Sequence, residues 1–362
     1  GLGPRRRYIG KVFALAQQGL LAIAVSPIFQ LDASMAGHAR WFFDRCLELY
    51  GRWASEDPSG LAPPVQFGDR QHPQSEESRI LFAARTASNA AQAIHLGLGY
   101  ILPVQPPPMY SFDPDSQRLA ISTPRYSTAI VVHNRGAVGY GGIDLCRLFD
   151  SLGHPVGCIA GFGIANFLAR VLDDRGGVLV DTQMGTRASM NVAAIDERGN
   201  LRRAGPGSAP YPSLPYAGPM RLVSISGRVG GAGAAIETEH ELGVEVIHLR
   251  WRMTLPKGGR WEIVLPSYGK SATVVAERPS GRLQLLPGQP AIALDRVGKV
   301  LIQADAGSYT LEVLDKSQPA TLRLVAVPLR SEAANPGPSL LLRGRPRRAD
   351  ELVEFALRLR IL

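Results

Sequence analysis

The sequence predicts an α+β protein of more than one domain, in which helices come first and a large antiparallel β-sandwich follows. The apolar residues recur at a helical spacing over the first hundred residues, and beyond a proline-rich connector at 103–109 they recur every second residue. The 39 glycines and 28 prolines require frequent turns, which weighs against an all-helical protein. A chain of 362 residues, 45% of them apolar, is long enough for two domains.

The first domain is expected over residues 1–102, and its first helix over the apolar run 12–25. Arg5–Arg7 and Lys11 precede that run and imitate the start of a signal peptide. Gln17 and Gln18 interrupt it and no small-residue cleavage site follows, which favours an amphipathic structural helix. The absence of an initial Met indicates a fragment or a processed chain.

Two more helices are expected before residue 100. Ser34 is a suitable N-cap for the second, whose apolar positions follow steps of three and four: Met35, Ala39, Phe42, Cys46, Leu49 and Trp53. The third begins near Ser75 and ends at Gly97 and Gly99, with Glu76 and Glu77 in the first turn, where the helix dipole favours acids. Its inward face is expected to hold Ile80, Ala84, Ala87, Ala91 and Ile94.

The second domain is expected over 110–330, with residues 331–362 as a C-terminal extension. Short β-branched segments bounded by turn residues predict twelve strands: 118–122, 128–133, 164–172, 178–182, 189–195, 221–226, 244–254, 260–265, 272–276, 299–303, 309–313 and 321–327. Residues 202–219 lack periodicity and are expected to form a long surface loop. Many short strands without intervening helices favour an antiparallel sandwich over βαβ units.

Several classes of function receive no support from the sequence. No apolar stretch is long enough to span a membrane, and the three cysteines are too far apart for a CxxC zinc site. Nucleotide-binding and hydrolase motifs are missing, and the glycine loop 139–142 has no phosphate-binding lysine after it. The seven histidines share no ligand spacing on a helix face, so neither a metal nor a cofactor is expected.

Three clusters combine side chains suited to an acidic sugar. His38, Arg40 and Trp41 lie at the start of the second helix, where Arg could pair with a carboxylate and Trp could stack on a pyranose ring. The alternative is an ordinary helix start with an arginine whose stem covers apolar surface. In the third cluster, alternation places Arg250 and Arg252 on one face of a strand and Trp251 on the other, which favours a core tryptophan.

The second cluster runs from Thr123 to Tyr140. Its phenol, imidazole, amide and guanidinium groups suit elimination chemistry, in which one group moves a proton and another neutralises a carboxylate; the candidates are Tyr126, His133, Asn134, Arg135 and Tyr140. The alternative is that Tyr126 and His133 simply pack at the edge of a sheet.

The sequence resembles the chondroitin, hyaluronate and xanthan lyases and the heparinase II/III-like group. Residues 26–32 through Gly37-His38-Ala39-Arg40 resemble the lyase stretch in which a Gly-Arg-x-x-Ser-Arg-like sequence follows an aspartate. Residues 119–130 and 139–149 resemble the first strands of the lyase β-domain and its Gly-Trp-Tyr-x-Gly-Asp-Gly segment. The order of helices, connector and sandwich is also the same, over most of residues 8–275.

The resemblance implies an (α/α) toroid before the sandwich, here incomplete because only about three of ten or more helices are visible. The lyases' catalytic Tyr and His, and their substrate-binding Asn, would lie upstream of residue 1. His38 replaces the first arginine of the motif, and His133-Asn134-Arg135 replaces a stretch that contains glutamate.

Two hypotheses follow. In the first, the protein is a polysaccharide lyase that cleaves a uronate-containing glycan by β-elimination, with Tyr126 and His133 as catalytic residues. His38, Arg40, Trp41, Asn134, Arg135 and Tyr140 then bind the substrate, and the helical and β clusters face each other across an open groove. In the second, the chain is a non-catalytic carbohydrate-binding or structural β-sandwich.

The net charge of +9 suits an acidic polymer under either hypothesis. No nucleic-acid-binding motif accompanies that charge, so an acidic polysaccharide is the expected partner and nucleic acid is not. The sequence predicts no oligomeric state. The resemblance implies an extracellular or periplasmic location.

Overall fold

The computed structural model describes fourteen parts of the chain, and every structural statement below concerns them. They are residues 33–54, 76–115, 117–132, 142–151, 155–159, 167–183, 188–204, 216–231, 233–268, 273–303, 307–315, 318–326, 336–346 and 352–362. The chain divides into two compact units, Gly1–Pro106 with Glu332–Ala334, and Pro107–Ser331 with Asn335–Leu362. The division between Pro106 and Pro107 falls inside the predicted connector.

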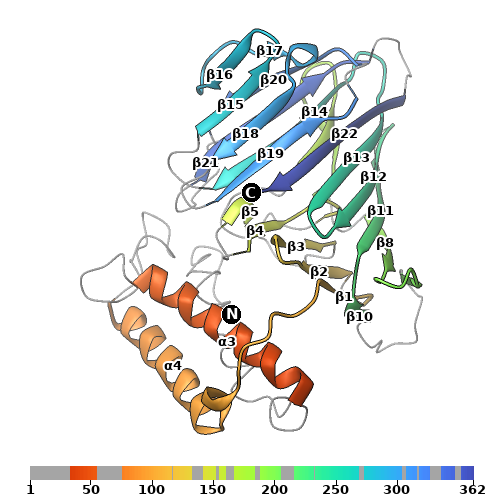
Figure 1. Cartoon of the computed structure of the whole chain (residues 1–362). Helices are drawn as coiled ribbons and strands as arrows, with labels where there is room; N and C mark the ends of the chain where they lie inside the picture. Colours follow the sequence, from red (N-terminus) through yellow and green to blue (C-terminus); the bar gives the residue numbers. More distant parts are fainter. Residues whose placement is uncertain are drawn as a thin grey trace. The chain divides into compact units, whose positions relative to one another are not determined.

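The first unit contains the helices α3 (Ala33–Ala54) and α4 (Glu76–His95) and a turn of 3-10 helix, η1 (Leu98–Tyr100) (Figure 1). A small apolar cluster holds them together, made of Ala36, Phe43, Ala93 and Leu98. Neither described α-helix has both the length and the apolar composition needed to cross a membrane.

The predicted helical toroid is wrong for the described part of the chain. That part contains two α-helices and consists mainly of antiparallel strands. The period of about 3.6 residues correctly predicts helices over 33–54 and 76–95, but a helical period carries no information on how many helices pack together.

The expected inward face of α4 is also wrong. Ile80 and Ile94 are 51% and 50% exposed, whereas Thr86 and Ala93 are 2% and 0% exposed. Thr86, Ala90 and Ala93 form a separate stripe at i, i+4 and i+7, and Ala90 packs partly on the apolar cluster. Small side chains let the neighbouring backbone approach closely, so α4 buries its small stripe and leaves its larger one exposed.

The second unit consists of three antiparallel sheets. The first has six strands in the order β10 (Tyr216–Pro219), β1 (Met109–Asp113), β2 (Arg118–Ser122), β3 (Tyr126–Val131), β4 (Arg147–Asp150) and β5 (Pro155–Ile159). The second has six strands in the order β17 (Ile292–Ala293), β20 (Ala320–Val325), β21 (Pro336–Gly344), β14 (Arg260–Tyr268), β6 (Leu168–Leu172) and β7 (Val178–Asp181).

The third sheet has ten strands. Their order is β16 (Gly281–Leu285), β15 (Thr273–Arg278), β18 (Lys299–Gln303), β19 (Ser308–Val313), β22 (Leu352–Ile361), β13 (Val246–Thr254), β12 (Ala234–Gly243), β11 (Leu222–Gly231), β8 (Ser189–Ile195) and β9 (Leu201–Ala204). A 3-10 turn, η3 (Leu294–Arg296), follows β17.

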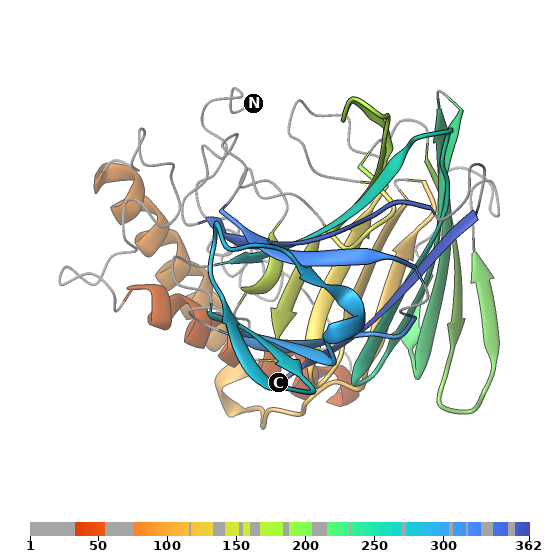
Figure 2. The same ribbon diagram turned by 90° about the horizontal axis from the view of Figure 1, so that it is seen from above.

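One continuous apolar core joins the three sheets. It contains Ile130 of the first six-stranded sheet, Trp261 of the second and Trp251 of the ten-stranded sheet, all 0% exposed. β11 and β12 contact β7 across this core, and Figure 2 shows the strands of the second unit curving around it. Alternation along each strand produces the core: in β22, residues 353, 355, 357, 359 and 361 are buried.

Two segments outside the predicted strands take part in these sheets. The expected loop at 202–219 begins in β9 and ends in β10. The expected extension 331–362 contains β21 and β22, both interior strands: β21 lies between β20 and β14, and β22 between β19 and β13.

Candidate functional site

An open pocket of about 670 Å³ lies where β14 begins, β20 begins and β21 ends. η3 and the residue before it contribute to its wall. A pocket of this volume is within the range that binds small organic ligands. Its lining residues are Arg260, Ala293, Asp295, Gln318, Pro319, Ala320, Thr321, Arg343, Gly344 and Arg345. It is called the arginine pocket below.

Positive charge dominates the arginine pocket. Three arginines and one carboxylate, Asp295, line it. Arg343 pairs with Glu262, whereas neither Arg260 nor Arg345 has an ion-pair partner among the described residues. The pocket therefore carries guanidinium charge that the described side chains do not neutralise.

Two buried polar atoms of this pocket lack hydrogen-bond partners in the described structure. Nε of Arg260 is an unused donor, and Oε1 of Gln318 is an unused acceptor. An unmade hydrogen bond on a buried group costs about 1–3 kcal/mol. Both atoms are themselves enclosed, so other parts of the Arg260 and Gln318 side chains form the pocket wall.

Local sequence explains how the pocket is built. Alternation along β14 turns Trp261 into the core and puts Arg260 and Glu262 on the opposite face of the sheet. Gly344 pairs with Trp261 across β14 and β21, and a Cβ there would lie only 2.5 Å from the indole ring. Glycine at 344 therefore lets the tryptophan fill the core directly beside the pocket.

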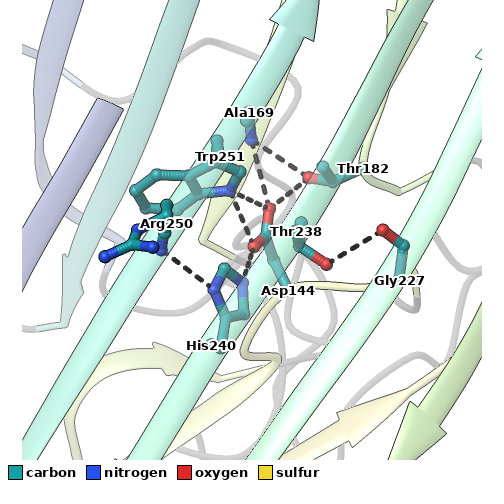
Figure 3. A network of polar contacts seen from close by, with 8 residues as sticks. All are labelled: Asp144, Ala169, Thr182, Gly227, Thr238, His240, Arg250 and Trp251. Atoms are coloured by element: carbon teal, nitrogen blue, oxygen red, sulfur yellow. Dashed lines mark hydrogen bonds and ion pairs between the residues drawn. The ribbon is translucent and has the colours of Figure 1, made fainter. Parts of the chain in front are cut away.

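A second polar cluster lies inside the sandwich, around the carboxylate of Asp144 (Figure 3). Oδ1 of Asp144 accepts hydrogen bonds from His240 Nε2 at 2.7 Å and Trp251 Nε1 at 3.0 Å. Oδ2 accepts from the hydroxyl of Thr182 and from the backbone N–H of Ala169 at 3.3 Å. The cluster ties the segment that contains Asp144 to β6, β12 and β13.

The Asp144 network has no free chemical group. Its four side chains, those of Asp144, Thr182, His240 and Trp251, are all 0% exposed. Nδ1 of His240 accepts a hydrogen bond from the backbone N–H of Arg250 at 3.3 Å. The ring proton is therefore on Nε2, which donates a hydrogen bond to Asp144. Nor do the described residues group three or more His, Cys, Asp or Glu side chains as a metal site would. The network is structural.

The residues predicted on the helix start lie on α3. Two of the three guanidinium nitrogens of Arg40 are engaged there: Nε donates to Asp44 Oδ1 at 2.9 Å, and Nη1 donates to the carbonyls of Gly99 at 3.0 Å and Ile101 at 3.1 Å. Trp41 packs edge-on against Phe42 and lies under the guanidinium of Arg45, and His38 is half-buried nearby. In this structure Arg40 fastens α3 to the turn after α4.

Of the predicted β cluster, Tyr126 is described, while His133, Asn134, Arg135 and Tyr140 lie outside the described residues. Tyr126 is 1% exposed, and its hydroxyl donates to the carbonyl of Gly243 at 2.6 Å. Burial raises the pKa of this phenol above its ordinary value, so the group stays protonated at neutral pH. The groove expected between the helical and β clusters stays a prediction.

Sequence reasoning missed the arginine pocket but identified the core tryptophan of the Asp144 network. The alternation Arg250-Trp251-Arg252 correctly predicts a core tryptophan, which is 0% exposed, while on the opposite face Arg250 is exposed and Arg252 is half-buried. The sequence pattern that could have indicated the pocket is Arg343-Gly344-Arg345. Its two arginines are two positions apart, so in a strand they lie on the same face, with a glycine between them. That pattern lies in the segment expected to be an extension.

Comparison with known proteins adds general likenesses. No family model matches the chain, and no curated protein matches it. Among solved structures, heparan sulfate lyase HepC from Pedobacter heparinus is 9% identical with a TM-score of 0.44, over 97% of this chain and 60% of that one. A 4-alpha-glucanotransferase from Thermococcus litoralis is 11% identical with a TM-score of 0.43, over 97% of this chain and 50% of that one.

A GH36 alpha-galactosidase, AgaB from Geobacillus stearothermophilus, is 8% identical with a TM-score of 0.42, over 70% of this chain and 41% of that one. This chain thus spans between two fifths and three fifths of the length of these three proteins. The heparan sulfate lyase belongs to the group that the sequence resembles, and its likeness to the present fold is loose. With TM-scores of 0.42–0.44, the likenesses assign neither a family nor an activity to the chain.

Proposed function

We propose that this protein binds an acidic carbohydrate in the arginine pocket. The observation that carries the proposal is that three arginines and a single carboxylate line one pocket of about 670 Å³, and that two of these arginines have no ion-pair partner among the described residues. Guanidinium groups bind carboxylate and sulfate oxygens through parallel hydrogen bonds. Gln318 and Thr321 also line the pocket, and polar side chains of this kind suit the hydroxyl groups of a sugar.

The charge of the whole chain supports the same class of ligand. A net charge of +9 attracts a polyanion at long range and raises its association rate at low ionic strength. A neutral sugar gains nothing from this field and leaves Arg260 and Arg345 without an anionic partner. We therefore expect carboxylate or sulfate groups on the bound glycan.

Cleavage of that glycan by β-elimination is the finer hypothesis, and the sequence resemblance supports it. The arginine pocket offers groups that neutralise a uronate carboxylate, but neither Tyr nor His lines it, and Asp295 is its one carboxylate. Because the phenol of Tyr126 is enclosed, His133 is the predicted residue left to move the proton. The described geometry therefore favours binding over catalysis.

The test of binding is calorimetry with a heparin-derived hexasaccharide and the full chain. Arg345→Gln removes an exposed pocket arginine and should weaken binding about tenfold, equivalent to about 1.4 kcal/mol. The matched control is Arg282→Gln, which removes the same charge from β16, outside the pocket lining. Neutral dextran should not bind. Equal affinities of the two variants, or no binding by the wild type, would refute the proposal.

The test of cleavage is the ultraviolet absorbance of the C4=C5 double bond after incubation with uronate polymers. A lyase produces this absorbance, and a binding protein does not. Tyr126→Phe keeps the ring and removes the hydroxyl, so unchanged turnover in this variant would assign Tyr126 to the core alone. A wild type that binds the polymer without absorbance change would refute the lyase hypothesis and leave the binding proposal intact.

A further inference from the structure

We infer that Glu262 is a positioning residue of the arginine pocket: it holds Arg343 in the orientation in which this arginine receives an anion. The inference rests on the proposed function and adds to it a side chain that does not itself line the pocket. Glu262 lies near the start of β14, between two arginines on the neighbouring strands.

Strand register places the three side chains in one row. Glu262 pairs with Arg170 of β6 on one side and with Arg343 of β21 on the other. All three therefore stand on the same face of the second six-stranded sheet, opposite the main core. The row is fixed by main-chain pairing as well as by its own ion pairs.

Each oxygen of Glu262 serves a different arginine. Oε2 accepts a hydrogen bond from Nε of Arg170 at 2.7 Å and pairs with Nη2 of the same arginine at 2.6 Å. Oε1 accepts a hydrogen bond from Nε of Arg343 at 2.6 Å and also pairs with its Nη2. Nη1 of Arg343 makes no hydrogen bond to the described residues, and Arg343 lines the pocket. Glu262 thus occupies the inner edge of this guanidinium and leaves Nη1 for a ligand.

The charge count of the row is also significant. Two guanidinium groups share one carboxylate, so the row keeps one net positive charge. Glu262 is 1% exposed, while the side chains of Arg170 and Arg343 are 33% and 39% exposed. The negative charge is therefore inside and the excess positive charge is at the surface. An anion in the pocket would complete the neutralisation.

A purely structural role would not need these charges. Desolvating an ion triad costs about as much as its Coulomb attraction returns, and well-packed apolar residues are often equally stabilising. The arrangement gives Arg343 one defined orientation, since a long flexible side chain is held at two donors. Holding it before binding lowers the entropy that a ligand must overcome.

Simple electrostatics and positioning predict opposite results for Glu262→Gln. The variant removes a negative charge next to the pocket, so charge alone would strengthen binding of a polyanion. Positioning predicts weaker binding, because a neutral amide holds Arg343 less firmly and offers a single acceptor oxygen to two arginines. The direction of the change in affinity therefore decides between them.

The experiment uses the full chain, a heparin-derived hexasaccharide and calorimetry. Glu262→Gln should weaken binding at least fivefold. The matched control is Glu354→Gln, which removes the same charge from an arginine-paired glutamate of the ten-stranded sheet that does not line the pocket. That control should bind as the wild type does or slightly more tightly. Circular dichroism confirms that each variant is folded.

A double-mutant cycle completes the test. Arg343→Gln should weaken binding, and adding Glu262→Gln to it should cause no further loss, because Glu262 acts through Arg343. If Glu262→Gln fails to fold, Arg343→Lys replaces it in the experiment. This variant keeps the positive charge but loses the planar guanidinium group, so binding should still fall at least fivefold. Unchanged or tighter binding by Glu262→Gln or Arg343→Lys would overturn the inference.

Failure of the inference is distinguishable from failure of the proposed function. If the wild type binds no acidic glycan, the proposed function fails and the positioning role with it. If the wild type binds and Arg345→Gln weakens binding while Glu262→Gln does not, the pocket stands and the inference on Glu262 alone is overturned.

Discussion

Asp144 is a buried carboxylate that accepts hydrogen bonds from two side-chain nitrogens, a hydroxyl and a backbone amide. Such a carboxylate stabilises the fold only while each of the surrounding donors keeps its hydrogen bond to it. An asparagine at this position would put an N–H₂ group against donors that already point inward. Each buried donor left without an acceptor costs about 1–3 kcal/mol.

Because at least two donors would lose their acceptor oxygen, we predict that Asp144→Asn lowers the free energy of unfolding by about 2 kcal/mol or more, measured by urea denaturation. The control, Asp174→Asn, changes an exposed carboxylate and should leave the midpoint within experimental error. If Asp144→Asn unfolds at the wild-type urea concentration, the network is not a structural element of the core.

Cys46 gives a prediction about reactivity. Burial raises the pKa of this thiol to about 11. The reactive form is the thiolate, so at pH 8 about 0.1% of Cys46 is reactive, against about a quarter for a thiol of ordinary pKa. Alkylation by iodoacetamide, followed by peptide mass spectrometry, should be about a hundredfold slower in the native protein than in urea. The native rate should rise steeply as the pH approaches 11, and equal native and unfolded rates would contradict this assignment.

At the scale of elements, Arg40 connects α3 to the turn that follows α4. Its Nη1 group donates to the carbonyls of Gly99 and Ile101, and at 3.3 Å to that of Leu98, which also accepts from the backbone N–H of Ile101. Arg40→Ala should release this turn and speed hydrogen exchange at the amide of Ile101, which donates to Leu98. Arg45→Ala, which breaks the exposed pair with Glu48, should leave that exchange rate unchanged. An unchanged rate in Arg40→Ala would show that the turn does not depend on Arg40.

Elements with clean local patterns were predictable from the sequence. The predicted strands 118–122, 189–195 and 299–303 coincide with β2, β8 and β18, because each is a short alternating run bounded by turn residues. β12 was missed because two polar residues, Thr238 and His240, occupy inward positions where the pattern requires apolar side chains. Their partners lie on β11 and β13 or in the core, which the local pattern does not reveal.

The arginine pocket was not predictable for a different reason. Its residues come from four segments between 260 and 345, and sequence order does not indicate that these segments meet. The row Arg170–Glu262–Arg343 likewise depends on the registers of three strands. Conversely, Arg40 and Tyr126 have the chemistry of binding residues, but tertiary contacts occupy their polar groups. Residue type predicts chemistry, whereas only the fold decides which groups are free.

At the scale of the whole molecule, the ten-stranded sheet depends on one strand. β22 pairs with β13 on one side and with β19 on the other. It therefore joins a group of five strands that begins with β13 to a group of four strands that begins with β19. A chain that stops at residue 351 should leave two unpaired edges, which are templates for aggregation. We predict that this truncated chain is largely insoluble.

Strand complementation checks that prediction. A synthetic peptide of residues 352–362 should pair with both edges and raise the soluble fraction of the truncated chain, measured after centrifugation. A peptide in which Val353, Phe355 and Leu357 are replaced by Ser should not do so, because these residues are buried in the core. A truncated chain that is soluble and unfolds like the wild type would contradict a central role for β22.

The central position of β22 also sets the timing of biosynthesis. About a hundred residues separate β13 from β22 along the chain, and a ribosome that adds about 5–20 residues per second needs several seconds to make them. During that interval, the edge of β13 that later pairs with β22 is unpaired. Until β22 emerges and pairs with β13, this edge is open to pairing with other chains.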